Sequence, residues 1–163
     1  MTDQAQRIAV LFDATFAAHR TVMRGGGTEP LYRPGRGDAP ALVVYTRDYP
    51  ASALHEAAHW CLAGARRRQL TDYGYWYVPG PRDSAQRRAF FAAECEVQAL
   101  EAVFANAAGV AFVVSADDFT APHAELEEFA RRVARRTAEL ATARLPPRAQ
   151  QFRAALQRHL GNG

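Results

Sequence analysis

Hydrophobic and polar positions follow two different periods along this chain, and these periods predict helices and strands in turn. In residues 4–24 the large apolar side chains recur at near-helical spacing, which predicts one helix that ends at three glycines, 25–27. Residues 28–40 are rich in proline and glycine, and we expect an extended loop with a short strand at 31–32. Residues 41–45 are apolar and include two β-branched side chains, so they predict a buried strand.

The remainder of the chain is predicted to be mainly helical. Ser52 suits the N-cap of a helix that continues to about residue 68, and the aromatic run 73–78 predicts a second strand. Further helices are expected at about 84–107, 122–143 and 146–160, and a strand or buried loop at 109–115. These elements predict an α+β fold, a helix-rich single domain of residues 1–163 with a small β-sheet.

Composition narrows the class of protein. The chain has 163 residues, of which 48% are hydrophobic and 23% charged, and this excludes a disordered chain and a collagen-like fibre. No apolar run approaches the roughly 20 residues that cross a bilayer, and the polar N-terminus does not resemble a secretory signal. Because Cys61 and Cys95 are too few for a disulfide framework, we expect a cytoplasmic protein with free thiols and no membrane contact.

All 20 basic residues are arginine, and the formal net charge is +3. This mildly basic balance suits an acidic protein partner, and no direct contact with nucleic acid is expected. The run Arg66, Arg67 and Arg68 is expected to be a solvated helix end, with docking of an acidic partner as the alternative.

A five-residue motif, His55-Glu56-Ala57-Ala58-His59, carries the strongest chemical signal. Positions i and i+4 share one face of a helix, so His55 and His59 can present two imidazoles to one metal ion. Five histidines placed at random give this pattern in roughly one chain in a hundred of this size. Two ordinary histidines of the core or surface are therefore the weaker interpretation.

A third ligand is expected from the predicted helix 84–107, because two histidines alone hold a metal weakly. Glu94, Gln98 and Glu101 recur at i, i+4 and i+7 and share one helix face, whereas Glu96 points elsewhere. Solvated carboxylates are the weaker, alternative explanation of this stripe. Glu94 is the preferred metal ligand, and Glu101 is the second choice or a hydrogen-bond partner of one histidine.

Two histidines and one carboxylate leave coordination positions open, so the chemistry depends on the metal. Zinc in such a site activates water for hydrolysis, with Glu56 as the general base. Ferrous iron leaves room for dioxygen as a co-substrate and supports oxidation. The spacing of the ligands does not distinguish between these metals.

Longer motifs around these residues resemble the elongation factor P hydroxylase family. The metal motif extends to S-A-L-H-E-A-A-H-W-C-L-A-G at 52–64, and D-Y-G-Y-W-Y at 72–77 is followed by G-P-R-D at 80–83. E-P-L-Y at 29–32 and Q-A-L-E at 98–101 match in order and spacing. H-E-x-x-H alone is shared with many metallopeptidases, but its extension to H-E-x-x-H-W-C together with Y-G-Y-W-Y is specific.

The resemblance implies a zincin-like metal site that is used for oxidation. Members of the family hydroxylate the modified lysine of bacterial elongation factor P after β-lysine has been attached to it. By position, His55, His59 and Glu94 would hold a ferrous ion, and β-lysylated elongation factor P would be the partner. The resemblance implies no requirement for 2-oxoglutarate.

Two other functions stay open on the residues themselves. A zinc metallopeptidase would use the same three ligands with Glu56 as its base, and a non-catalytic binding module would keep a structural metal or none. The aromatic residues Tyr73, Tyr75, Trp76 and Tyr77 are expected in the core or along a substrate cleft.

Overall fold

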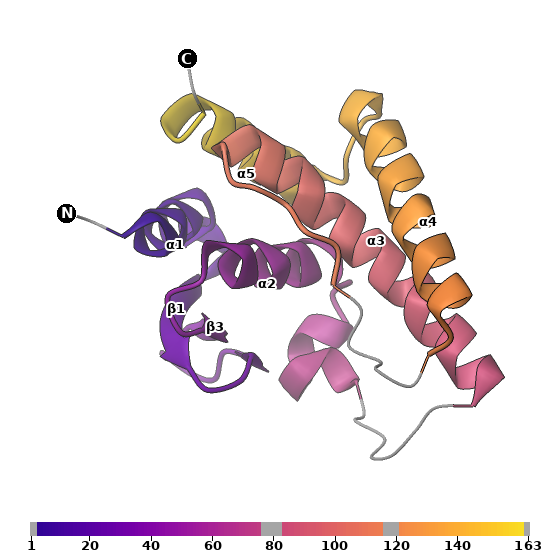
Figure 1. Cartoon of the computed structure of the whole chain (residues 1–163). Helices are drawn as coiled ribbons and strands as arrows, with labels where there is room; N and C mark the ends of the chain where they lie inside the picture. Colours follow the sequence, from indigo (N-terminus) through magenta and orange to yellow (C-terminus); the bar gives the residue numbers. More distant parts are fainter. Residues whose placement is uncertain (1–2, 76–82, 116–120, 162–163) are drawn as a thin grey trace.

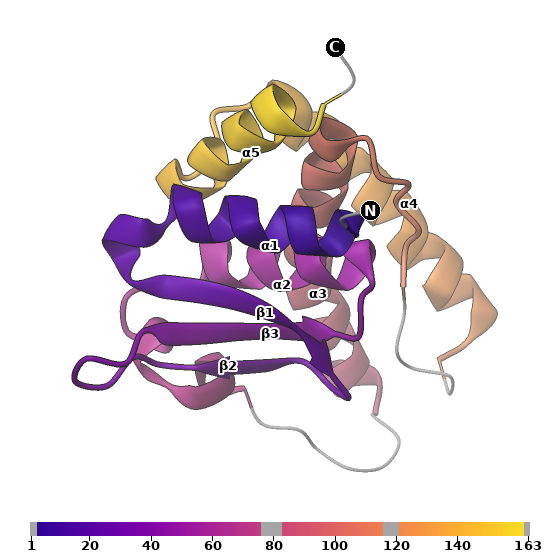
Figure 2. The same ribbon diagram turned by 90° about the vertical axis from the view of Figure 1, so that its left-hand side faces the viewer.

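A small mixed β-sheet carries helices on one face, and three further helices extend the fold away from it (Figures 1 and 2). The computed structural model describes residues 3–75, 83–115 and 121–161. The sheet has the order β1-β3-β2, in which β1 (Thr21–Gly27) runs parallel and β2 (Leu31–Arg33) antiparallel to the central strand β3 (Ala41–Thr46). This arrangement confirms the strands predicted at 31–32 and 41–45 and the α+β class.

Five α-helices are found among the described residues: α1 (Gln4–Thr15), α2 (Pro50–Leu62), α3 (Ser84–Ala108), α4 (His123–Thr142) and α5 (Pro147–His159). α1 packs on β1 and α2 packs on β3, while α3 crosses both α2 and α5. α4 lies along α3 on the side away from the sheet (Figure 1). No helix in the described part of the chain combines the length and the apolar character needed to span a membrane.

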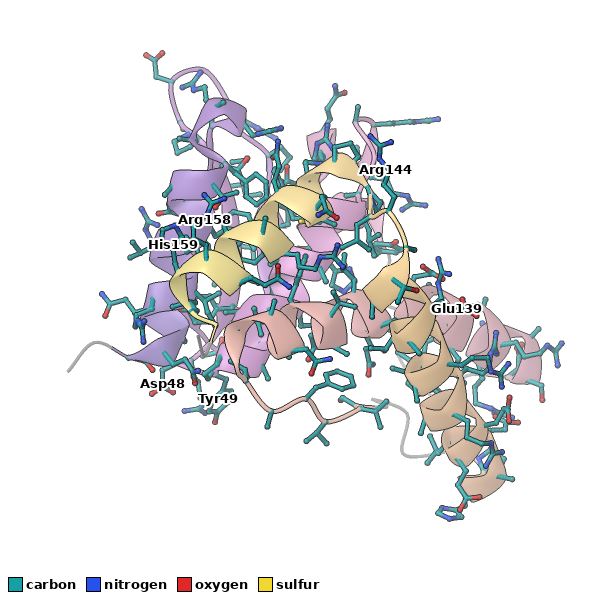
Figure 3. The ribbon with its side chains drawn as sticks, turned by 90° about the horizontal axis from the view of Figure 1, so that it is seen from above. Asp48, Tyr49, Glu139, Arg144, Arg158 and His159 are labelled. Carbon is teal, nitrogen blue, oxygen red and sulfur yellow. The ribbon has the colours of Figure 1, made fainter. Side chains whose placement is uncertain are left out.

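The main core lies where four helices converge. Aromatic side chains from α1, the turn after it, α2 and α5 pack together there, and Phe12 lies edge-on to the Trp60 ring at 5.3 Å and to the Phe152 ring at 5.7 Å. A second apolar cluster joins α3 to α4 through Phe91 and Phe129, whose ring centroids are 4.8 Å apart. Charged side chains such as Glu139, Arg144 and Arg158 point outward on α4, α5 and the turn between them (Figure 3). The helix α2, which carries the His55–His59 motif, is thus packed between the sheet and the other helices.

The single helix predicted for residues 4–24 is wrong beyond Thr15. The chain instead makes a short 3-10 turn at Ala17–His19 and enters β1, where Thr21 and Met23 are buried in alternation with Val22. This conformation is stabilised by pairing with β3, a contact between distant residues that a local sequence pattern does not contain. The glycines at 25–27 are part of the strand, and a Cβ atom on Gly25 would lie only 2.5 Å from the Tyr45 ring.

The predicted limits of α2 are also wrong. The helix begins at Pro50, a favoured residue for the first turn, and the Ser52 hydroxyl accepts a hydrogen bond from the Thr46 backbone N–H at 2.9 Å. It ends at Leu62 rather than near 68, because Arg148 of α5 donates to the Trp60 carbonyl at 2.6 Å and to the Ala63 carbonyl. These bonds satisfy backbone oxygens that another helical turn would have used.

The strand predicted at 73–78 is not formed in the part of it that the structure describes. Thr71–Gly74 is a 3-10 turn, and residues 76–78 lie outside the described ranges. Residues 109–115 are neither strand nor fully buried; exposed and half-buried side chains alternate along them. The helices predicted at 84–107, 122–143 and 146–160 are confirmed as α3, α4 and α5.

Candidate metal centre

The two histidines of the motif lie one turn apart on α2 and face α3. Their ring centroids are 4.8 Å apart, and their side chains keep only 25% and 20% exposure. The opposite faces of the same helix carry Leu54, Ala57 and Trp60, all buried in the core. Packing therefore fixes the rotation of α2 that turns both imidazoles toward α3.

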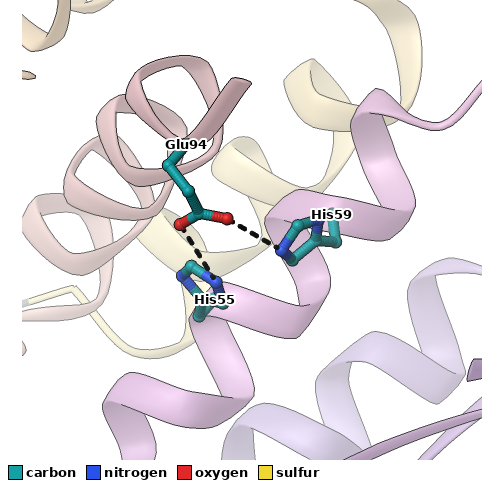
Figure 4. A group of neighbouring side chains, drawn as sticks. All are labelled: His55, His59 and Glu94. Atoms are coloured by element: carbon teal, nitrogen blue, oxygen red, sulfur yellow. Dashed lines mark ion pairs between the residues drawn. The ribbon is translucent and has the colours of Figure 1, made fainter. Parts of the chain in front are cut away.

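Glu94 of α3 meets the two histidines from the facing helix. Its Oε2 atom lies 3.9 Å from His55 Nε2 and its Oε1 atom 3.8 Å from His59 Nε2 (Figure 4). One ligand atom of each of the three residues lies within 4.8 Å of the other two. Within residues 3–75, 83–115 and 121–161, this is the single group of three or more such side chains with metal-site spacing. The three residues proposed from the sequence are thus brought together.

Glu101, the second choice as ligand, lies behind His55 and does not join that group. Its Oε1 atom accepts a hydrogen bond from His55 Nδ1 at 2.7 Å, and the carboxylate is buried. A carboxylate only accepts, so Nδ1 carries the proton and Nε2 is the nitrogen turned toward Glu94. This is the histidine-partner arrangement that the sequence left open for Glu101.

Gln98 is a buried glutamine, 3% exposed, that connects Glu94 to another part of the chain. Its amide Nε2 donates to Glu94 Oε2 at 3.2 Å and also to the Ser115 carbonyl, while its Oε1 accepts from the Ser115 N–H at 2.9 Å. The side chain thus pairs with Ser115 as a neighbouring strand would. The orientation of the Glu94 carboxylate is tied to the segment that follows α3.

The pKa values of the two histidines are driven apart. Burial lowers the pKa of His55, but the hydrogen bond to Glu101 and the charges of three surrounding glutamates outweigh it and raise this pKa from 6.5 to about 9. Burial and the neighbouring charge of His55 lower the pKa of His59 to about 3. Without a metal ion, His55 is therefore a cation and His59 a neutral imidazole at neutral pH.

Glu56, the candidate catalytic residue, is buried at 7% exposure and has no hydrogen-bond partner within the described ranges. Burial is the main cause that raises its pKa, the charge of His55 opposes it, and the charges of Glu94, Asp72 and Glu101 add to it, so that the pKa rises from 4.5 to about 7. A carboxyl group that titrates near pH 7 can hold or release a proton under ordinary conditions. Such a group beside a set of metal ligands is suited to acid–base work.

The aromatic residues divide between core and surface. Tyr73 is buried, stacks on Tyr32 at 4.2 Å and lies 6.1 Å from the His59 ring, whereas Tyr75 is 54% exposed and 6.4 Å from the same ring. Trp76 and Tyr77 lie outside the described residues. Both described tyrosines line a hollow beside His59, and Tyr73 also belongs to the core cluster.

Both cysteines belong to apolar clusters. Cys61 belongs to the main core and Cys95 to the cluster between α3 and α4. Sequence reasoning missed the roles of Gln98 and Arg148. The i+4 spacing of Gln98 from Glu94 is the signal that could have revealed the first; no local pattern marks the second.

Two comparisons with known proteins show what this chain is similar to. A family model described as Elongation factor P hydroxylase matches residues 11–163. The Elongation factor P lysine hydroxylase of Haemophilus influenzae is 37% identical over 158 residues, which are 96% of this chain and 89% of that relative.

Proposed function

This chain belongs to the elongation factor P hydroxylase family, and from that premise we propose that it hydroxylates the β-lysylated lysine of bacterial elongation factor P. Support comes from the length of the match, which includes every residue of the candidate centre. The centre itself adds a chemical argument that does not depend on the relative's name.

The proposed cofactor is a ferrous ion held by His55, His59 and Glu94. Two metal–ligand bonds of about 2.0–2.2 Å span at most about 4.4 Å, and the carboxylate oxygens lie 3.8 and 3.9 Å from the imidazole nitrogens, so Glu94 can share one ion with each histidine. The three ligand atoms together lie within 4.8 Å of one another. When bound, ferrous iron in such a site leaves positions open for dioxygen and supports oxidation. Zinc fits the same donors and can substitute in the purified protein.

The other residues of the centre prepare these ligands. Glu101 orients His55 and stabilises it as a ligand, and Gln98 fixes the Glu94 carboxylate. Glu56 is the proposed catalytic residue, which takes or gives a proton at its buried carboxyl group. Its pKa of about 7 suits transfer in both directions at neutral pH.

The observation that carries the proposal is the placement of Glu94 between two histidine Nε2 atoms in a chain with this family match. The test is intact mass. Iron-loaded protein, supplied with dioxygen and a reductant, should add one oxygen atom to β-lysylated elongation factor P and none to the unmodified protein. The His59→Ala variant is the matched control. No mass gain with soluble, iron-loaded protein would refute the proposal.

A zinc peptidase is the second candidate, because the buried Glu56 with a pKa of about 7 also suits a base that activates water. The same preparation loaded with zinc should leave elongation factor P and casein uncleaved if the hydroxylase assignment is correct. Cleavage that depends on Glu56 would favour the peptidase instead.

A further inference from the structure

A hollow of about 600 Å³ opens beside His59, at the C-terminal end of α2. Its walls come from that helix end, from the chain that follows it up to Tyr75, and from Val97 of α3. Its size falls in the range of small-molecule sites. None of the described residues that line it is acidic, although three glutamates lie close by at the metal centre.

Two arginines give this hollow a positive wall. Arg66 is exposed, and its guanidinium has no partner within the described ranges. Arg67 is held in place: its guanidinium lies 4.8 Å from the centre of the Tyr75 ring and donates to the Tyr73 carbonyl at 3.1 Å. Arg68 has a different role, because it donates to the Ala63 carbonyl. The run lies beyond the end of α2 at Leu62, its first two members are exposed as expected, and only these two line the hollow.

The turn that forms the outer wall is held in a strained backbone conformation. Asp72 and Tyr73 both adopt left-handed backbone angles, with φ of 51° and 60°, and neither is glycine. The Tyr32 N–H donates to Asp72 Oδ1 at 2.9 Å, and the stacked rings of Tyr32 and Tyr73 hold the same turn. Strained residues of this kind cluster at ligand sites, where the surrounding structure maintains them. Here the strain places Tyr73 and Tyr75 on the wall beside His59.

We infer that this hollow is a subsite for a carboxylate group, bound by Arg66 and Arg67 next to the metal ligand His59. A guanidinium binds a carboxylate through two parallel hydrogen bonds, and the Tyr75 ring holds Arg67 ready for this. The carboxylate can come from a small free organic acid or from an acidic side chain of the protein target. The second source rests on the proposed function, whereas the first does not.

The test uses the full-length, metal-free protein, so that the probe cannot bind by coordinating a metal. Succinate is titrated into the wild-type protein and the Arg66→Gln/Arg67→Gln double variant, with Arg135→Gln on α4 as a control that removes one exposed charge elsewhere. The single variant Arg66→Gln is included because Arg67 also supports the turn. In a parallel arm, the affinity for elongation factor P is measured with the same proteins.

In the first outcome, the affinity for succinate falls about fivefold or more in the double variant and in Arg66→Gln, but not in the control. This result supports the subsite and identifies a free organic acid as the source of the carboxylate. Binding of either kind should fall with added salt. If succinate does not bind but the same two variants weaken the affinity for elongation factor P, the carboxylate belongs to the target. If both affinities are unchanged in the variants, the subsite is refuted. Hydroxylation by the wild-type protein is measured separately, so a failure of the proposed function is recognised independently.

Discussion

Metal affinity should rise with pH, by about tenfold per unit between pH 7 and pH 9, because a metal ion must displace the proton of His55. The pKa of His55 is raised to about 9. At pH 7, two units lower, about one molecule in a hundred has a neutral His55, so the apparent affinity is reduced about a hundredfold. His59 has a pKa lowered to about 3, stays neutral throughout and adds no slope.

The substitution that tests this reasoning is Glu101→Gln. The amide oxygen still accepts the hydrogen bond from His55 Nδ1, but the negative charge is lost, so the pKa of His55 falls toward 6.5. The rise in affinity should therefore end at a lower pH. Glu96→Gln is the matched control, since the Glu96 carboxylate pairs with Arg136 at 2.8 Å and not with the metal centre.

The measurement is competition for zinc with a chromophoric chelator, from about pH 6 to about pH 10, corrected for the chelator's own protonation. The wild-type protein and Glu96→Gln should show the same slope and reach a plateau near pH 9. An affinity that is flat with pH in the wild type, or a plateau that does not move in Glu101→Gln, would refute the role given to His55 and its partner.

Four further predictions concern the two histidines, Gln98, the pH dependence of stability and the aromatic core. His55→Ala and His59→Ala should each abolish metal binding without loss of the fold, and wild-type metal content in either would overturn the ligand assignment. Gln98→Met should weaken metal affinity by about 10- to 100-fold, measured by the same competition; an unchanged affinity would show that Gln98 does not position Glu94. In thermal melts, the metal-free protein should lose about 3 kcal/mol of stability between pH 6.5 and pH 9. The reason is that the folded pKa of His55, about 9, lies above its unfolded value of 6.5. The stabilisation by protonated His55 is complete below pH 6.5 and is lost as the pH rises through 9. The same loss in His55→Ala would show that another group causes it. Phe12→Ala should lower the unfolding free energy by about 3–5 kcal/mol in urea titration, since the ring is fully buried against three other rings. A loss below about 1 kcal/mol would show that the surrounding side chains repack into the space.

Local sequence patterns were sufficient for α3, α4 and α5 and for the approach of the candidate ligands. The i, i+4 spacing of His55 and His59 places both rings on one face, and the acidic stripe on α3 supplies Glu94 opposite them. Both depend on helical periodicity alone, which a sequence window contains. The family resemblance added the function, which periodicity does not carry.

The elements that local patterns misplaced are those determined by distant residues. Thr21–Gly27 is a strand because β3 lies beside it, although its apolar spacing continues that of α1. α2 stops at Leu62 because of Arg148, which is 88 positions beyond Trp60. The left-handed turn at Asp72 and Tyr73 is held by Tyr32, 40 positions before Asp72. In each case, a contact made only in the folded chain outweighs the local preference.

The clamp that Arg148 places on the end of α2 has a consequence for the order of events during synthesis. Translation adds α2 long before it adds Arg148, so the nascent chain holds both histidines while the last turn of their helix still lacks its partners. Glu94 also follows the histidines by a whole segment of chain. A growing polypeptide therefore cannot bring the three candidate ligands together before α3 has been made, and the end of α2 gains its Arg148 partners only when α5 has docked. For the proposed iron centre, this order of assembly means that the complete set of ligands, with both of its helices fixed, forms only late in synthesis.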